Sequence, residues 1–130
     1  MLAKCRKRIE RHHWSNVELI DCEYGTGPVS GGQADIVLMS YSLSMMPHGK
    51  SVLRSARSEL KPGGRIGIVD FVITKNALPA KLFAKWLSLN HVSTSPTYLQ
   101  DLGDLFEPCL CLSHSVHFGT WGYYRFVGRR

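Results

Sequence analysis

A Lys-Pro-Gly-Gly turn between a helical pattern and an apolar run constrains the fold of this chain more than any other feature. The turn lies at residues 61–64, after the helix-like segment 50–60 and before the strand-like segment 65–72. Proline ends a helix, and paired glycines allow the chain to turn back towards a sheet. Residues 66–69 are almost entirely apolar, which predicts a strand buried on both faces of a parallel sheet.

The rest of the chain alternates between helix and strand patterns. We expect helices at 2–13, 77–90 and 97–105, strands at 17–20 and 34–40, and two more strands within 110–128. Loops are predicted at 25–33 and 41–47. Strands that alternate with helices indicate an α/β fold with a parallel sheet and right-handed crossovers.

Size, charge and cysteine content limit the possible classes of protein. The 130 residues suffice for one small domain, and no stretch approaches the roughly 20 apolar residues of a membrane span. Four scattered cysteines do not form a disulfide framework, so we expect a reducing compartment, the cytoplasm. The net charge of +6 lies largely near the two ends. It indicates either a solvated helix face or an anionic membrane surface as a peripheral partner, rather than nucleic acid.

A resemblance to a known family rests on four segments of this sequence. They are the Lys-Pro-Gly-Gly turn, Tyr41-Ser42-Leu43-Ser44-Met45-Met46-Pro47, Ser95-Pro96, and Tyr123-Tyr124-Arg125-Phe126-Val127-Gly128-Arg129. Together they resemble class I S-adenosylmethionine-dependent methyltransferases, most closely the diacylglyceryl-homoserine N-methyltransferase of betaine-lipid synthesis. The resemblance implies a Rossmann-like sheet with C-terminal antiparallel edge strands and S-adenosylmethionine as cofactor. It also implies methyl transfer to the amine of a diacylglyceryl-homoserine-type lipid.

The same resemblance implies a missing part. Family members begin with a strand, a glycine-rich turn, a helix and a second strand, and residues 1–130 hold no counterpart of these elements. We therefore expect 1–130 to be the C-terminal two-thirds of a single methyltransferase domain, truncated at its N-terminus. Either the missing half or a partner would cover the sheet edge. Two alternatives stay open: another class I methyltransferase acting on a lipid or small molecule, and a non-catalytic binding module.

The resemblance also implies where the cofactor binds. An acidic residue after strand 17–20 would accept a hydrogen bond from adenine, and Glu23, followed by Tyr24, matches that position better than Asp21. Ser40, Tyr41 and Ser42 lie at the C-terminal end of strand 34–40, where the methionine part of the cofactor and the acceptor amine would meet. The plain alternatives are a solvated acid at a strand end and a Tyr41 ring that belongs to the core or its rim.

Several residues are candidates for catalysis or substrate binding. The Tyr41 ring is suited to a methylated amine, which is a cation that an aromatic face attracts. Asp70 either orients or deprotonates the amine or caps a neighbouring helix. We predict substrate contacts from Phe71, Trp86 and Tyr123; Trp86 belongs to a stripe with Leu82, Phe83 and Leu89 that either forms a lid or packs in the core.

A cysteine and histidine cluster near the C-terminus does not predict a metal site. Its spacings are Cys109-x-Cys111 and His114-x-x-His117. Structural zinc prefers two to four residues between paired cysteines and three to five between paired histidines, whereas these pairs enclose only one and two. On a strand, His114 and His117 would also face opposite sides of the sheet. We therefore expect no bound metal.

Overall fold

A four-stranded mixed sheet forms the centre of the molecule. The computed structural model describes residues 2–25, 33–46, 48–72, 78–89, 92, 97–116 and 121–130. The strands follow the order β1-β2-β4-β3, with β1 at Ala34–Ser40, β2 at Leu60–Val72, β3 at Glu107–Val116 and β4 at Trp121–Arg129. Strands β1 and β2 are parallel, whereas β4 is antiparallel to both β2 and β3. The predicted parallel pair with a C-terminal antiparallel edge is confirmed.

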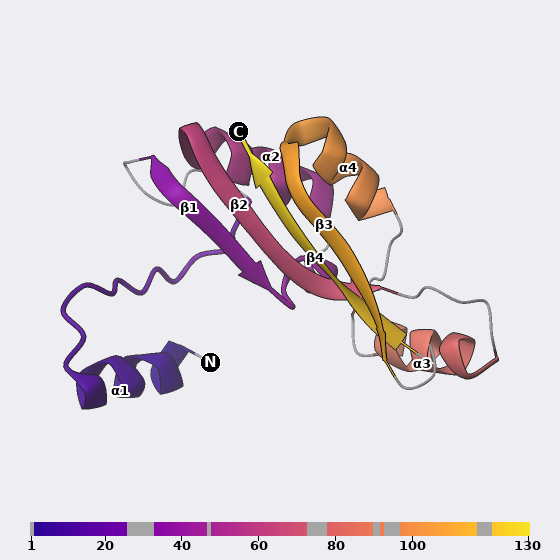
Figure 1. Cartoon of the computed structure of the whole chain (residues 1–130). Coiled ribbons are helices and arrows are strands. Elements are labelled where there is room, and N and C mark those ends of the chain that lie inside the picture. The colour runs from indigo at the N-terminus through magenta and orange to yellow at the C-terminus, as the bar shows by residue number, and fades with distance from the viewer. Residues whose placement is uncertain are drawn as a thin grey trace.

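Helices cover one face of this sheet (Figure 1). The elements are α1 (Leu2–His12), a 3-10 turn η1 (Leu43–Met45), α2 (Gly49–Glu59), α3 (Leu78–Leu89) and α4 (Thr97–Leu105). All four predicted α-helices are confirmed to within one residue at each end. Helices α2 and α4 lie against the sheet, while α1 lies apart from it at the end of an extended connection. The Ser95-Pro96 segment before α4 and Pro47 lie outside the described residues.

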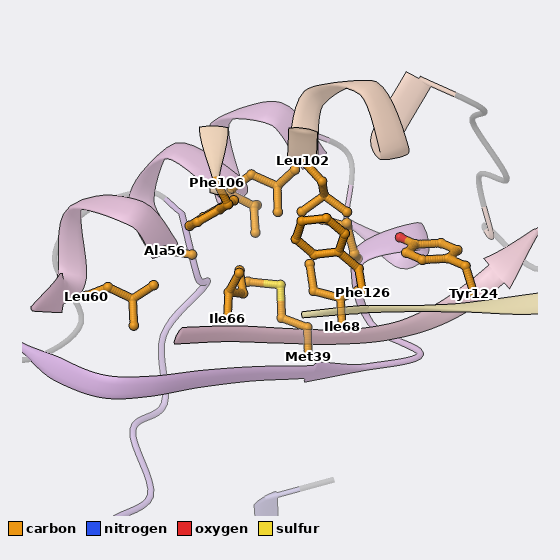
Figure 2. Close-up of a cluster of buried hydrophobic side chains, with 12 residues drawn as sticks. Met39, Ala56, Leu60, Ile66, Ile68, Leu102, Phe106, Tyr124 and Phe126 are labelled. Carbon is orange, nitrogen blue, oxygen red and sulfur yellow. The ribbon is translucent and has the colours of Figure 1, made fainter. Parts of the chain in front are cut away.

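The hydrophobic core lies between α2 and α4 on one side and the sheet on the other (Figure 2). Alternate residues of β2 and β4 point into it, as the pleat of a strand requires. Helix α2 contributes Val52, Leu53 and Ala56, whose spacing places them on one side of the helix. The buried cluster consists of Met39, Leu43, Val52, Leu53, Ala56, Leu60, Ile66, Ile68, Leu102, Phe106, Tyr124 and Phe126.

The prediction that residues 66–69 belong to a strand buried on both faces is wrong, and the neighbouring strand β1 is likewise covered on one face only. Met39 points into the core, but Ile36 and Leu38 are 67% and 73% exposed on the opposite face of β1. On β2, Gly67 and Val69 of that face are only half-buried. The described helices that pack on the sheet, α2 and α4, share one face, so the other face stays open to solvent. We call this surface the open face.

The predicted strand at 17–20 is also wrong. These residues are not paired with any strand in the described part of the chain, and most of their side chains are exposed. Alternating apolar residues favour a strand, but the strand forms only when a neighbouring strand supplies hydrogen bonds. In contrast, β2 begins at Leu60, five residues earlier than predicted, and includes the Lys-Pro-Gly-Gly turn. Gly63 supplies the left-handed φ of 77° there.

Candidate functional site

The candidate site lies at the sheet edge where β1 and β2 end and β4 begins. Ser40 pairs in register with Val69, and Phe71 pairs with Tyr123. Open α/β sheets bind ligands at the carboxyl ends of their parallel strands. Because β4 is antiparallel, its first residues reach the same edge as the last residues of β2. The topology therefore gathers side chains from three segments that are distant in sequence.

Tyr41 immediately follows β1 in a strained backbone conformation. Its φ is 48°, in the left-handed region that non-glycine residues rarely adopt. Its backbone N–H donates a 2.7 Å hydrogen bond to the carbonyl of Val69, which holds this turn against β2. Strain of this kind amounts to about 1–3 kcal/mol and persists where surrounding structure enforces it, often at functional sites. The Tyr41 ring remains exposed.

An aromatic row runs across the edge from β1 to β4. We define it as Tyr41, Phe71 and Trp121: ring centroids are 4.8 Å apart between the first pair and 6.0 Å between the second. Tyr123 lies opposite Phe71 in the ladder, and its ring stacks on His114 at 5.0 Å. The structure therefore brings the predicted residues Tyr41, Phe71 and Tyr123 to one place. The prediction missed Trp121, although its spacing of two from Tyr123 places both on one face.

His114 is part of this aromatic surface. The Arg125 guanidinium donates to His114 Nε2 at 2.9 Å, so this ring nitrogen acts as the acceptor. Within the described residues, no group of three or more His, Cys, Asp or Glu side chains could hold a metal ion. His117 lies outside the described residues.

Asp70 is buried beneath the edge, with 1% of its surface exposed. Its carboxylate accepts hydrogen bonds from the backbone N–H of Ser44 at 2.8 Å and from the Ser44 hydroxyl at 2.6 Å. It also accepts the backbone N–H of Phe71 at 2.8 Å. These contacts favour the capping role over contact with a substrate amine, because the carboxylate holds η1 against the end of β2. Ser44 is a structural partner of Asp70 that sequence reasoning missed, although it lies in the motif of residues 41–47.

Tyr124 lies beside this buried carboxylate. Its hydroxyl has no hydrogen-bond partner in the described part of the chain, and only 2% of the residue is exposed. Burial raises the pKa of the Tyr124 phenol well above its usual range, and the nearby charge of Asp70 raises it further. The phenol therefore stays neutral at physiological pH.

Two of the predicted adenine-binding residues lie at a small hollow formed with the start of α2 and with Met46, which follows η1. Glu23 and Tyr24 line a hollow of about 70 Å³ with Met46, His48 and Val52, among others. The Tyr24 hydroxyl donates a 2.9 Å hydrogen bond to Glu59 at the end of α2, and burial together with this bond raises its pKa. Tyr24 thus anchors this segment to α2. The hollow is smaller than the roughly 300–1,000 Å³ of usual ligand pockets, and the adenine contact of Glu23 stays a prediction.

The remaining predicted residues differ in position. Asp21 is exposed on the connection that leads to β1, whereas Ser40 and Ser42 flank Tyr41 at the edge. Trp86 belongs to α3. More than half of Trp86 is exposed, so it is not a core residue of the described domain. The Phe83 side chain lies outside the described part of the structure.

None of the helices in the described part of the chain has the length and apolar character needed to cross a bilayer.

Comparison with known proteins identifies the fold. A curated relative, the ubiquinone/menaquinone biosynthesis C-methyltransferase UbiE of Pseudomonas fluorescens (strain Pf0-1), is 32% identical over 68 residues, covering 52% of this chain and 27% of the relative. The N-methyltransferase NodS of Bradyrhizobium japonicum WM9, solved with S-adenosyl-L-homocysteine, superposes with a TM-score of 0.75 at 12% identity. That match covers 100% of this chain and 63% of NodS.

A second solved structure agrees. Geranyl diphosphate C-methyltransferase of Streptomyces coelicolor A3(2) gives a TM-score of 0.72 at 12% identity and covers 95% of this chain and 59% of that enzyme. The chain therefore spans about a quarter of the curated relative and less than two-thirds of either solved relative. The mixed sheet is that of the Rossmann-like class I methyltransferases, as the sequence predicted. A family model described as a methyltransferase domain matches residues 1–123, and the chain belongs to this methyltransferase family.

Proposed function

We propose that this protein is an S-adenosylmethionine-dependent N-methyltransferase whose acceptor is the amine of a diacylglyceryl-homoserine-type lipid. The observation that carries the proposal is the aromatic row at the carboxyl ends of β1 and β2, with Tyr41 held in a strained conformation. An edge of this kind suits an acceptor that becomes a methylated cation, because aromatic faces attract such cations. The sequence resemblance at residues 41–47 and 123–129 supports the lipid acceptor.

The residues at the edge fit part of a cofactor site. When bound, S-adenosylmethionine supplies an activated methyl group on a positively charged sulfur. Ser40, Tyr41 and Ser42 would hold its methionine part, and Glu23 would hold its adenine. The fit rests on the exposed Tyr41 ring and on the acidic Glu23 beside η1. The small size of the hollow at Glu23 implies that further residues complete the adenine pocket.

The proposed contribution of this chain to catalysis is positioning. Methyl transfer to an amine is an in-line displacement that needs little acid or base chemistry. Tyr41 and Phe71 would hold the neutral amine in line for attack, and their rings would stabilise the positive charge that develops on nitrogen as the methyl group is transferred. Asp70 acts indirectly, since its three hydrogen bonds to Ser44 and Phe71 fix the turn that presents Tyr41. The exposed edge allows the amine proton to pass to solvent.

We infer that a further protein segment completes the domain. On the open face, Ile36 and Leu38 of β1 expose large apolar side chains, and β1 is a free edge strand in the described sheet. Free edges and apolar faces of this kind favour pairing with another segment. The partner is the cofactor-binding half of the domain, either in the same polypeptide or in a second one.

A test uses the natural polypeptide with S-adenosylmethionine and diacylglyceryl-homoserine lipid dispersed in detergent. Mass spectrometry of the lipid would reveal mono-, di- and trimethylated products. We expect Tyr41→Ala and Phe71→Ala to lower kcat/KM by about tenfold to a hundredfold, equivalent to about 1.4–2.7 kcal/mol. Trp14→Ala is the matched control, because Trp14 is an exposed aromatic that stacks on His12 of α1, away from the edge. If the protein binds S-adenosylmethionine but the amine lipid gains no methyl group, the proposal of a lipid acceptor is refuted.

The likeness to a quinone C-methyltransferase favours a second candidate function, methylation of a carbon atom of an aromatic ring. The same assay with a quinol acceptor separates the two. Product from the quinol and none from the amine lipid would favour C-methylation. A polypeptide that binds neither S-adenosylmethionine nor S-adenosylhomocysteine in calorimetry would instead be a non-catalytic binding module.

A further inference from the structure

Helix α3 exposes a continuous stripe of large apolar side chains. Leu82, Trp86 and Leu89 are spaced by four and three residues, which places them on one face of the helix. Their exposed fractions are 62%, 56% and 73%. Leu87, one position after Trp86, is buried at 3%, so the helix packs by a different face. Single exposed apolar residues are ordinary, but three in a row on one helix face mark an interaction surface. We call these three residues the α3 stripe.

The charge around the α3 stripe has one sign. Lys81 and Lys85 are exposed and lie directly beside it, four residues apart. Helix α3 contains no acidic residue along its whole length. A surface that is apolar, bordered by lysine and free of negative charge is complementary to an anionic lipid interface. A tryptophan within the stripe agrees with this, since indole rings favour the boundary between headgroups and acyl chains.

We propose that α3 docks on an anionic bilayer, with the α3 stripe at the acyl boundary and the two lysines on lipid phosphates. The proposal rests on the lipid acceptor of the proposed function and names the surface from which that acceptor would be taken. Helix α3 begins six residues after Val72, so the connection spans at most about 20 Å from the end of β2. A lipid headgroup beside α3 is thereby brought near the aromatic row without leaving the membrane.

Helix α1 is a weaker candidate for this role. It carries more positive charge, from Lys4, Lys7, Arg8 and Arg11 among others. Its apolar positions Leu2, Cys5 and Ile9 are half-buried. Helix α1 thus offers charge without a row of exposed large apolar side chains, and charge alone gives binding that salt screens.

The experiment is sedimentation of the natural polypeptide with vesicles of phosphatidylcholine alone or phosphatidylcholine mixed with phosphatidylglycerol. We expect binding to the mixed vesicles only. Leu82→Ser with Trp86→Ser should lower the partition coefficient by on the order of a hundredfold, since both side chains leave the acyl boundary. Lys81→Gln with Lys85→Gln should lower it by roughly thirtyfold. The charge-matched control is Arg54→Gln with Arg57→Gln on the exposed side of α2, which should bind as the natural protein does.

Circular dichroism and thermal melting confirm that each variant is folded, which we expect because the substituted side chains are exposed. Binding that survives both α3 changes would overturn the proposal. An apolar stripe that instead drives self-association, measured by light scattering and abolished by the serine substitutions, would overturn it in favour of a protein partner. Methyl transfer to detergent-dispersed lipid separates this inference from the proposed function. A Lys81→Gln, Lys85→Gln variant that methylates dispersed lipid but not vesicle lipid confirms both, and vesicle binding without any methyl transfer supports docking alone.

Discussion

Replacing Asp70 with alanine is expected to destabilise this chain more than any change at the candidate edge. The Asp70 carboxylate is buried and accepts three hydrogen bonds, two from Ser44 and one from the Phe71 backbone. Removal of the carboxylate leaves these three donors without partners, and each unsatisfied buried donor costs about 1–3 kcal/mol. Phe71 is only half-buried, so water can satisfy its N–H in part. We therefore expect a loss of about 3–5 kcal/mol in the free energy of unfolding.

Ser44→Ala removes one charge-assisted hydrogen bond and leaves the two backbone bonds in place. The expected loss is about 1.5–3 kcal/mol. A double-mutant cycle between Ser44→Ala and Asp70→Ala should give a coupling energy of at least about 1 kcal/mol, because the two side chains share this bond. Urea denaturation followed by far-ultraviolet circular dichroism measures all four free energies.

Asp35→Ala is the matched control on the neighbouring strand. Asp35 pairs with Lys61 at 2.8 Å, but its side chain is 78% exposed, and exposed pairs contribute about 0–1 kcal/mol. A loss below about 1 kcal/mol for Asp70→Ala, similar to that of the control, would refute the structural role of Asp70. In that case the carboxylate would be free to serve the acceptor amine, and the catalytic alternative would regain support.

Two further predictions concern glycines and tyrosines. A Cβ at Gly49 would lie 2.5 Å from the Tyr98 ring, so Gly49→Ala should lower the free energy of unfolding by about 1–3 kcal/mol. Gly103 in α4 has no atom within 4 Å of such a Cβ, so Gly103→Ala should raise it by about 0.5–1 kcal/mol, and urea denaturation of both variants checks the contrast. The neutral phenols of Tyr24 and Tyr124 have raised pKa values in the folded state, so their contribution to stability is complete below the ordinary tyrosine pKa of about 10. It is lost as the pH rises above that value, because only the unfolded chain then ionises. Thermal melts at increasing alkaline pH should show this loss, and Tyr24→Phe with Tyr124→Phe should reduce it; an unchanged pH dependence would contradict the assignment.

The sequence correctly predicted the elements that have a long apolar periodicity or that end at proline and glycine. The predicted helix 50–60 has Val52, Leu53, Ala56 and Leu60 as its apolar side, and all four are buried, although Leu60 already belongs to β2. The Lys-Pro-Gly-Gly turn predicted the passage from α2 into β2. The prediction of a strand at 17–20 was wrong because four alternating residues favour an extended backbone but cannot provide the neighbouring strand with which to form hydrogen bonds. Likewise, the apolar runs of β1 and β2 could not reveal that one of their faces is uncovered.

The candidate edge shows the same division. Family resemblance pointed to Tyr41, Phe71 and Tyr123, and the structure brings these residues together. The structure also shows that Trp121 belongs to the aromatic row and that Ser44 donates a hydrogen bond to the Asp70 carboxylate. These additions depend on the pairing of β2 with β4 and on the short turn after β1. Neither is visible in local spacing.

The sequence by itself determined the helices, most of the strands and the positions where the chain turns, because these follow from local periodicity and from proline and glycine. Only the tertiary structure decided which strands are neighbours, and so which face stays open and which rings meet. Strand order, register and burial arise from contacts between residues far apart in the chain. Asp70 illustrates the reason: its carboxylate became a structural acceptor only when η1, 26 residues earlier, folded back onto the end of β2.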